Sequence, residues 1–126
     1  MKSLLMVALF AAVAFAGCSS APTDDCIKSN DFVTPHQDAD GNYIVCMLGE
    51  NQFAPAKAEV PAGATVVWIN KGGVHNTVSD DDLWRSEITS GDGGVNHMQT
   101  FADVGDYDYH CQPHQSLGMV GTIRVV

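Results

Sequence analysis

The stretch Tyr107-Asp108-Tyr109-His110-Cys111 alternates apolar and polar side chains, and it decides the fold class expected for this chain. The odd positions hold tyrosine and cysteine, whereas the even positions hold aspartate and histidine. Because successive side chains of a strand point to opposite faces of the sheet, this pattern predicts a strand with one buried face. Cys111 should therefore point into the core with the two tyrosines, and His110 should point outward.

Further short runs of β-prone residues lie before and after this strand. They predict strands at 43–48, 58–60, 65–69, 98–101, 107–111 and 120–126. Turn residues such as Pro61-Ala62-Gly63 and Asn70-Lys71-Gly72-Gly73 separate them. Many short strands with turn signals between them indicate an all-β sandwich or barrel. Met98, in the run 98–101, is expected to pack in the interior.

The composition limits the classes of protein to which the chain can belong. Its 126 residues allow one compact domain. The formal charge is −9, with 15 acidic against six basic residues. Phosphate backbones repel such a chain, which excludes a general nucleic-acid-binding protein. The hydrophobic fraction of 45% argues against wholesale disorder.

The N-terminus has the features of a targeting segment. Lys2 precedes the unbroken apolar run 4–16, which as a helix would span only about 20 Å of the ~30 Å membrane core. Residues 1–17 are therefore expected to be a signal peptide. The sequence Phe15-Ala16-Gly17-Cys18 resembles a bacterial lipobox, which would make Cys18 a lipid anchor. Phe15 stands where leucine is usual, and cleavage without a lipid is the alternative.

The mature chain would consist of two parts. Residues 18–41 are polar and are expected to form a lipid-anchored tether and N-terminal extension, whereas 42–126 would form the folded domain. Loss of Lys2 would leave five basic against 15 acidic residues, a formal charge of −10. Apart from Cys18, three cysteines remain. An exported, oxidising setting favours a disulfide between Cys26 and Cys46, and the alternative is that both stay reduced.

The strongest chemical signal is the spacing Cys111-x2-His114-x4-Met119. A thiolate, an imidazole and a thioether together suit copper, whose known trigonal site has two histidines, one cysteine and a long axial methionine. Such a site needs a second histidine. His75 is the natural candidate, because it follows the expected strand 65–69.

These motifs resemble those of the cupredoxins, the small blue copper proteins of the plastocyanin, halocyanin and amicyanin type. The resemblance covers 42–126. The segments that carry it are Phe53-Ala54-Pro55, 61–68, Gly72-Gly73-Val74-His75-Asn76, Cys111-Gln112-Pro113-His114 and 118–121.

The resemblance implies a Greek-key β-sandwich of about eight strands that binds one type 1 copper. His75 and His114 would supply nitrogen ligands, Cys111 the thiolate and Met119 a weak axial sulfur. The implied function is a monomeric carrier of single electrons outside the cytoplasm, not an enzyme.

Two further residues have roles in the resemblance. Asn76 would tie the His75 loop to the Cys111 loop through hydrogen bonds, and such outer bonds influence redox potential. Pro113 would remove a backbone N–H near the sulfur.

The resemblance also implies surfaces for redox partners. The edge of His114 would serve as the electron port, and Leu117 would contribute to an apolar patch around it. The run Asp80, Asp81 and Asp82 would attract a partner with a basic face, such as a cytochrome or a dehydrogenase. A solvated turn is the alternative interpretation of these three aspartates.

Two other functions remain open from the sequence. His110 lies next to Cys111, and in copper enzymes such a histidine binds a second, catalytic copper, which is the pattern of a multi-copper oxidoreductase. A copper store or chaperone is the other alternative. Copper stoichiometry and reversible one-electron cycling would distinguish these three functions.

Overall fold

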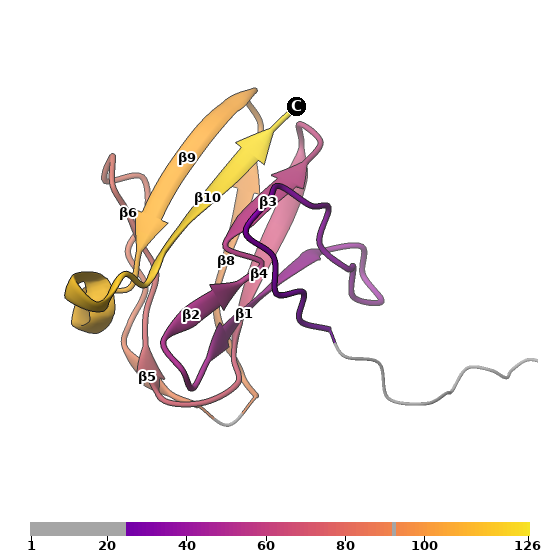
Figure 1. Ribbon diagram of the computed structural model, residues 1–126. Helices are drawn as coiled ribbons and strands as arrows, with labels where there is room; N and C mark the ends of the chain where they lie inside the picture. Colours follow the sequence, from indigo (N-terminus) through magenta and orange to yellow (C-terminus); the bar gives the residue numbers. More distant parts are fainter. Residues whose placement is uncertain (1–24, 92) are drawn as a thin grey trace, which may run out of the picture.

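The computed structural model describes residues 25–91 and 93–126, which form two packed four-stranded sheets (Figure 1). One sheet has the order β2-β1-β4-β8, with bounds Gln52–Ala54, Tyr43–Leu48, Ala64–Asn70 and Val95–Phe101. The other has the order β3-β10-β9-β6, with bounds Lys57–Val60, Val120–Val125, Gly105–His110 and Val78–Ser79. The prediction of an all-β sandwich is confirmed.

Two smaller elements lie at one end of the sandwich. The strands β5 (Val74–His75) and β7 (Thr89–Ser90) pair with each other, and we call them the β5–β7 pair. The 3₁₀ helix η3 (Gln112–Leu117) connects β9 to β10 and projects from the same end of the sandwich (Figure 1). Both sheets are mixed, because β1 runs parallel to β4 and β3 runs parallel to β10.

The predicted alternation in β9 is present in the structure. Tyr109 is 1% exposed and Cys111 is 0% exposed, whereas Asp106 and Asp108 face the solvent. β8 starts three residues earlier than the expected strand 98–101. The sequence did not predict the two-residue strands β5, β6 and β7, because two residues are too few to show alternation.

Aromatic rings fill the space between the two sheets. Trp68 packs edge-on against Tyr109 at a centroid distance of 5.3 Å, and Trp84 packs edge-on against Phe101 at 5.5 Å. Met98, which was expected to be internal, is 49% exposed, so that expectation is wrong. It pairs with Val67, whose side chain lies in a cluster separate from these rings, so the period of two places Met98 on the outer face of the sheet.

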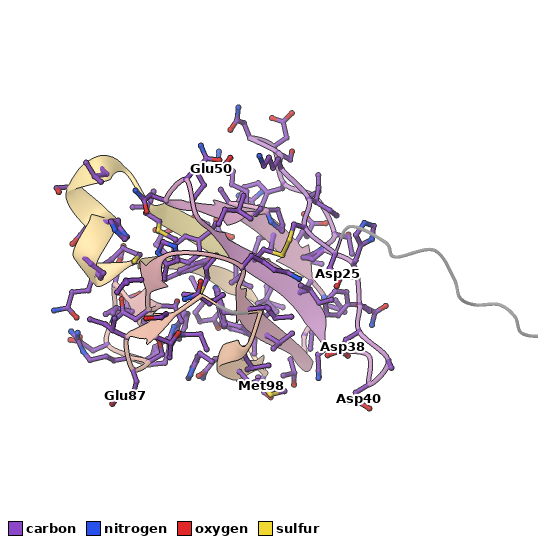
Figure 2. The ribbon with its side chains drawn as sticks, turned by 90° about the horizontal axis from the view of Figure 1, so that it is seen from below. Asp25, Asp38, Asp40, Glu50, Glu87 and Met98 are labelled. Carbon is purple, nitrogen blue, oxygen red and sulfur yellow. A yellow bond between two sulfur atoms is a disulfide. The ribbon has the colours of Figure 1, made fainter. Side chains whose placement is uncertain are left out.

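The N-terminal extension packs on the sandwich from residue 25 onward. A disulfide joins Cys26 to Cys46 in β1, with a Cα–Cα distance of 5.6 Å (Figure 2). Val33 pairs with β3, since its N–H donates to Lys57 O at 3.2 Å. Phe32 lies 3.7 Å under the guanidinium carbon of Arg124. The extension therefore contacts both sheets.

The expected signal peptide 1–17 and lipid anchor Cys18 lie outside the described residues. Within residues 25–91 and 93–126, no helix is long and apolar enough to cross a membrane.

Candidate metal centre

Three of the four predicted ligands lie on one loop, residues 111–119, which we call the metal loop. Backbone hydrogen bonds close it: Cys111 N–H donates to Met119 O at 3.0 Å, and Met119 N–H donates to His114 O at 3.2 Å. Gly118 ends η3 with a φ of 86°, in the left-handed region that glycine adopts without steric cost. Bonds within the loop therefore contribute to holding the segment that carries these three ligands.

The fourth predicted ligand reaches the metal loop from the β5–β7 pair. The Nδ1 atom of His75 lies 3.7 Å from Cys111 Sγ, and the Nδ1 atom of His114 lies 3.5 Å from the same sulfur. All three candidate ligand atoms lie within 4.8 Å of one another. His75 and Cys111 are wholly buried, whereas His114 is half-buried.

A carbonyl of β1 fixes which nitrogen of His75 faces the sulfur. His75 Nε2 lies 2.9 Å from Leu48 O, and because a carbonyl only accepts, Nε2 carries the proton. Nδ1 of the neutral ring is then free to bind a metal ion. Burial lowers the pKa of His75 below its ordinary value, and this effect outweighs the opposing backbone hydrogen bonds of Gly72 and Leu48. The ring is therefore neutral at pH 7.

The sulfur ligands lie in an apolar surrounding. Cys111 and Met119 are both 0% exposed and belong to the same hydrophobic cluster. Burial raises the pKa of the Cys111 thiol, and the backbone amides of Asn76 and His114 act in the opposite direction. A metal ion must displace this proton when it binds, because the thiolate is the ligand.

The donor set fits copper. Two imidazole nitrogens, a buried thiol and a buried thioether match the soft ligands of a blue-copper site. Zinc favours four cysteine, histidine or carboxylate ligands, and here the described residues bring only three such groups together. His75, Cys111, His114 and Met119 are therefore the candidate ligands of one type 1 copper.

Asn76 links the two chain segments that carry the ligands. Its Oδ1 atom accepts the Gln112 N–H at 2.8 Å, and its Nδ2 atom donates to Ser86 O at 3.3 Å. Asn76 is 1% exposed, so these bonds lie in the interior.

Pro113 lies in the first turn of η3. The first N–H groups of a helix have no partner within the helix, so the missing N–H of proline costs no hydrogen bond there.

The three aspartates are arranged differently from one another. Asp80 Oδ1 lies 2.7 Å from His110 Nδ1, a contact that the sequence pattern did not indicate. Asp81 and Asp82 are exposed in a turn that closes on Ser79, with the Asp82 N–H donating to Ser79 O at 3.2 Å. Within the described residues, no second group of three potential metal ligands lies at His110.

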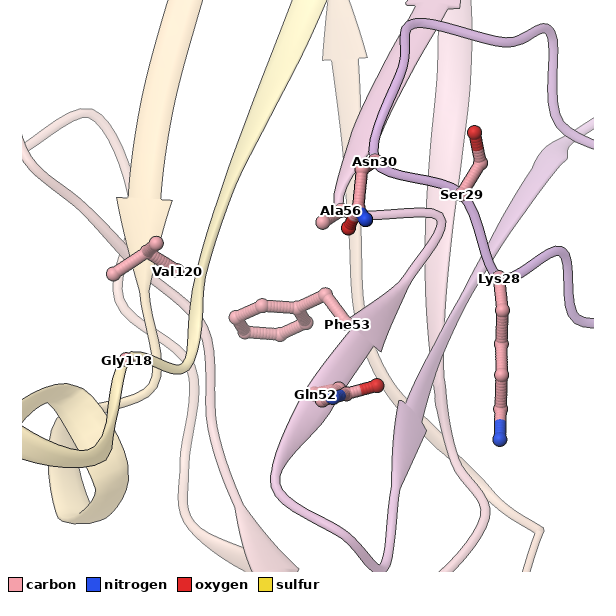
Figure 3. Close-up of a pocket in the computed structure, with 8 residues that line it drawn as sticks. All are labelled: Lys28, Ser29, Asn30, Gln52, Phe53, Ala56, Gly118 and Val120. Atoms are coloured by element: carbon pink, nitrogen blue, oxygen red, sulfur yellow. The ribbon is translucent and has the colours of Figure 1, made fainter.

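The surface around the metal loop combines apolar residues with the half-buried His114. Leu117 is 67% exposed, and Val74, in β5 beside η3, is 48% exposed. Val74 was missed in the sequence because a single valine in a glycine-rich loop gives no signal. A groove of about 540 Å³ lies beside the loop, and its lining contains none of the four candidate ligands (Figure 3).

Comparison with known proteins identifies the family. Residues 44–126 match the model of the copper binding proteins of the plastocyanin/azurin family. The chain is 34% identical to the chloroplastic plastocyanin of Tetradesmus obliquus, over 98% of this chain and 83% of that protein. It is 33% identical to the halocyanin of Natronomonas pharaonis, over 81% of this chain and 66% of that protein.

Solved structures show the same architecture. A mutant of amicyanin in its reduced state superposes with a TM-score of 0.61 and 26% identity, over 71% of this chain and 86% of that one. A purple cupredoxin from Nitrosopumilus maritimus superposes with a TM-score of 0.59 and 26% identity, over 66% and 98%. On its sequence, its fold and its ligand set, this chain belongs to the plastocyanin/azurin family of copper-binding proteins.

Proposed function

We propose that this protein carries single electrons between redox proteins outside the cytoplasm, with His75, Cys111, His114 and Met119 as the ligands of its copper. The observation that carries this proposal is the convergence of Cys111 Sγ and two histidine Nδ1 atoms within 4.8 Å. Bound copper would supply the Cu(II)/Cu(I) couple. The family relationship to plastocyanin and halocyanin supports the same function.

The protein's own residues would keep the site unchanged during electron transfer. The bond from His75 to Leu48 O holds one ring, and the short metal loop holds the other three ligands. The buried positions of Cys111 and Met119 exclude water from the sulfur atoms. His114 is the ligand that reaches the surface, so it would be the port through which electrons enter and leave.

The test of this function is copper loading followed by redox titration. Wild-type protein should bind one copper ion per chain, show the intense visible absorption of a thiolate–copper bond and cycle reversibly without losing the metal. Cys111→Ser should lose that absorption completely while its circular dichroism remains that of a folded β protein. A blue Cys111→Ser protein would eliminate the ligand assignment.

The same measurements distinguish the two other functions. A multi-copper oxidoreductase would bind more than one ion, with His110 as a ligand, whereas in the structure His110 contacts Asp80. A copper store or chaperone would not complete reversible one-electron cycles without losing its metal. The single group of three candidate ligands among the described residues favours the carrier.

We propose further that the protein is exported and lipid-anchored through Cys18. The lipobox-like sequence Phe15-Ala16-Gly17-Cys18 supports this proposal, and stable anchoring requires more than one acyl chain on that residue. Mass spectrometry of the native N-terminus tests it. An unmodified terminus at Ser19 or later would refute the anchor and leave the carrier function untouched.

The partner surface would consist of the apolar residues around His114 and the acidic run 80–82. A basic face on a cytochrome or a dehydrogenase subunit would fit this charge, and small contact areas with fast exchange are usual for electron transfer. The exposure of Leu117 and Val74 beside half-buried His114 supports the apolar part. We expect the carrier to act as a monomer.

A further inference from the structure

β8 contains a β-bulge at Asn96. In the ladder between β4 and β8, Trp68 lies opposite His97 and Ile69 lies opposite Val95, so Asn96 is an extra residue between these two pairs. A bulge bends its strand and re-aims the side chain of the extra residue, and bulges are over-represented next to functional sites. The bulge therefore determines the direction in which the Asn96 side chain points.

The carboxamide of Asn96 contacts the β5–β7 pair and the residues just before β7, Ser86 and Glu87. Its Nδ2 atom lies 3.3 Å from His75 O, 3.0 Å from Glu87 O and 2.8 Å from Thr89 Oγ1. Its Oδ1 atom lies 2.5 Å from Ser86 Oγ. Because the carbonyls of His75 and Glu87 only accept hydrogen bonds, the nitrogen must face them, which fixes the orientation of the amide.

Ser86 extends this set of hydrogen bonds beyond His75. Its hydroxyl accepts the N–H of Thr77 at 2.8 Å, so its own proton is available for Asn96 Oδ1. The carbonyl of Ser86 accepts from Asn76 Nδ2 at 3.3 Å. Ser86 is 8% exposed, and Thr77 and Asn76 are buried more completely. Asn96 is thus bonded to His75 directly and, through Ser86, to the two residues that follow it.

The β5–β7 pair depends on such contacts because it is very short. His75 pairs with Thr89 and Val74 with Ser90, and two isolated strands of this length are not stable alone. Asn70, at the end of β4, donates to Gly73 O at 3.2 Å and to Thr89 O at 3.0 Å. Two asparagines on neighbouring strands therefore hold this pair against the sandwich.

We propose that Asn96 is a positioning residue of the copper site: the β8 bulge aims its carboxamide at the His75 carbonyl and at β7, and so sets where the His75 ring meets Cys111. The inference rests on the proposed function, since it concerns a copper ligand. The Leu48 carbonyl holds the His75 ring at its Nε2 atom, whereas Asn96 holds the backbone carbonyl of His75. Removing Asn96 frees the backbone while the ring stays protonated on Nε2.

Copper affinity and midpoint potential of the full chain test this inference. Outer residues that orient a ligand typically change metal affinity by ~10–100-fold. Asn96→Ala should raise the copper Kd, measured by competition with a chelator, about tenfold and shift the potential. Ser86→Ala should change both quantities in the same direction, because it releases Asn96 Oδ1.

Thr100→Ala is the matched control. Thr100 lies on the same strand and is exposed, and its hydroxyl lies 2.7 Å from the hydroxyl of Thr65. The variant should lose this side-chain bond and keep the wild-type Kd and potential. All proteins are compared at a temperature at which each is folded.

The outcomes separate positioning from mere stability. Wild-type Kd and potential in Asn96→Ala and Ser86→Ala, with only a lower Tm, would overturn the inference. If Asn96→Ala does not fold, the Kd and potential of Ser86→Ala decide alone. A wild-type protein that binds no copper would refute the proposed function itself, whereas normal wild-type binding with unaffected variants would refute only the role of Asn96.

Discussion

The two sides of the copper site are built in different ways. Cys111, His114 and Met119 belong to nine consecutive residues, and bonds within the metal loop hold them together. His75 belongs to a two-residue strand, and residues from β1, β4 and β8 hold it in place. The first side is therefore formed mainly by residues near one another in the sequence, with one bond from Gln112 to distant Asn76. The second side depends on tertiary packing. The difference predicts that the two sides will respond differently to mutation.

Removing each histidine ring should give the largest effect and the clearest contrast. His75→Gly and His114→Gly should both lose the thiolate–copper absorption completely. Added imidazole should restore it in His114→Gly, because that ring is half-buried. It should not restore it at the same concentration in His75→Gly, because that site is sealed, with 0% exposure. Absorption spectra over an imidazole titration measure this.

Cys111→Ser serves as the control for this experiment. It should stay colourless at every imidazole concentration, since a nitrogen ligand cannot replace the thiolate. Equal rescue of the two histidine variants would show that the β5–β7 pair opens as easily as the metal loop.

The difference between the metal loop and the His75 side also explains which ligands could be predicted from the sequence. The spacing of Cys111, His114 and Met119 is visible in the order of the residues, and so is the alternation that buries Cys111. His75 was found through the resemblance to a family and its place after a strand. The bond of Asn76 to Gln112, across 36 positions, was expected only from that resemblance. The bond of His75 to Leu48 crosses 27 positions and was not expected, because residue order gives no distance between such segments.

The errors and omissions have related physical causes. Met98 was expected inside because methionine is usually packed, but its position in the β4–β8 register places it on the outer face. The bulge at Asn96 could not be predicted, because nothing in the sequence marks an extra residue in a strand. The contact between Asp80 and His110 arises from β6 lying beside β9, a pairing of a two-residue strand.

The N-terminal extension differs from the copper site because a disulfide, Cys26–Cys46, fastens it to the sandwich. Cys26→Ala with Cys46→Ala should lower the free energy of unfolding by about 3 kcal/mol, because the bond closes a loop across a sequence separation of 20. Urea denaturation of the copper-free protein measures this. The copper spectrum should remain that of the wild type, since neither cysteine is a ligand. A changed spectrum would show that the extension reaches the site through β1.

Two glycine substitutions compare the thermal stability of the His75 side with that of the metal loop. In Gly91→Ala the new Cβ would meet the backbone of Gly72, close to His75, and overpacking of this kind costs about 1–3 kcal/mol. In Gly118→Ala the Cβ would meet open space, and only the φ of 86° costs energy, about 1–2 kcal/mol. Thermal unfolding measures both. A larger loss for Gly118→Ala would show that the metal loop is the more constrained side.

We expect the smallest effect on the rate of association with a redox partner. Here the contribution of the acidic run 80–82 is compared with that of the apolar residues around His114. Asp81→Asn with Asp82→Asn removes two exposed charges and leaves the contact of Asp80 with His110 in place. Asparagine tolerates the positive φ of 61° at position 82. If charge steers the encounter, association with a basic partner should slow at low salt and approach the wild-type rate at physiological salt. The reason is that the Debye length falls from ~30 Å at 0.01 M to ~8 Å.

Asp31→Asn with Asp40→Asn is the control, because it removes the same number of exposed charges from another place, the N-terminal extension. Asp40 lies on the loop of that extension labelled in Figure 2. The control variant should slow association less at every ionic strength, because steering depends on where charge lies as well as on how much there is.

Leu117→Asp should impair transfer at high salt too, because it places a charge in the apolar contact beside His114. Stopped-flow rates over a salt series measure all three. Equal rates for the two double variants would reduce 80–82 to a solvated turn, and docking would then depend on the apolar surface around His114.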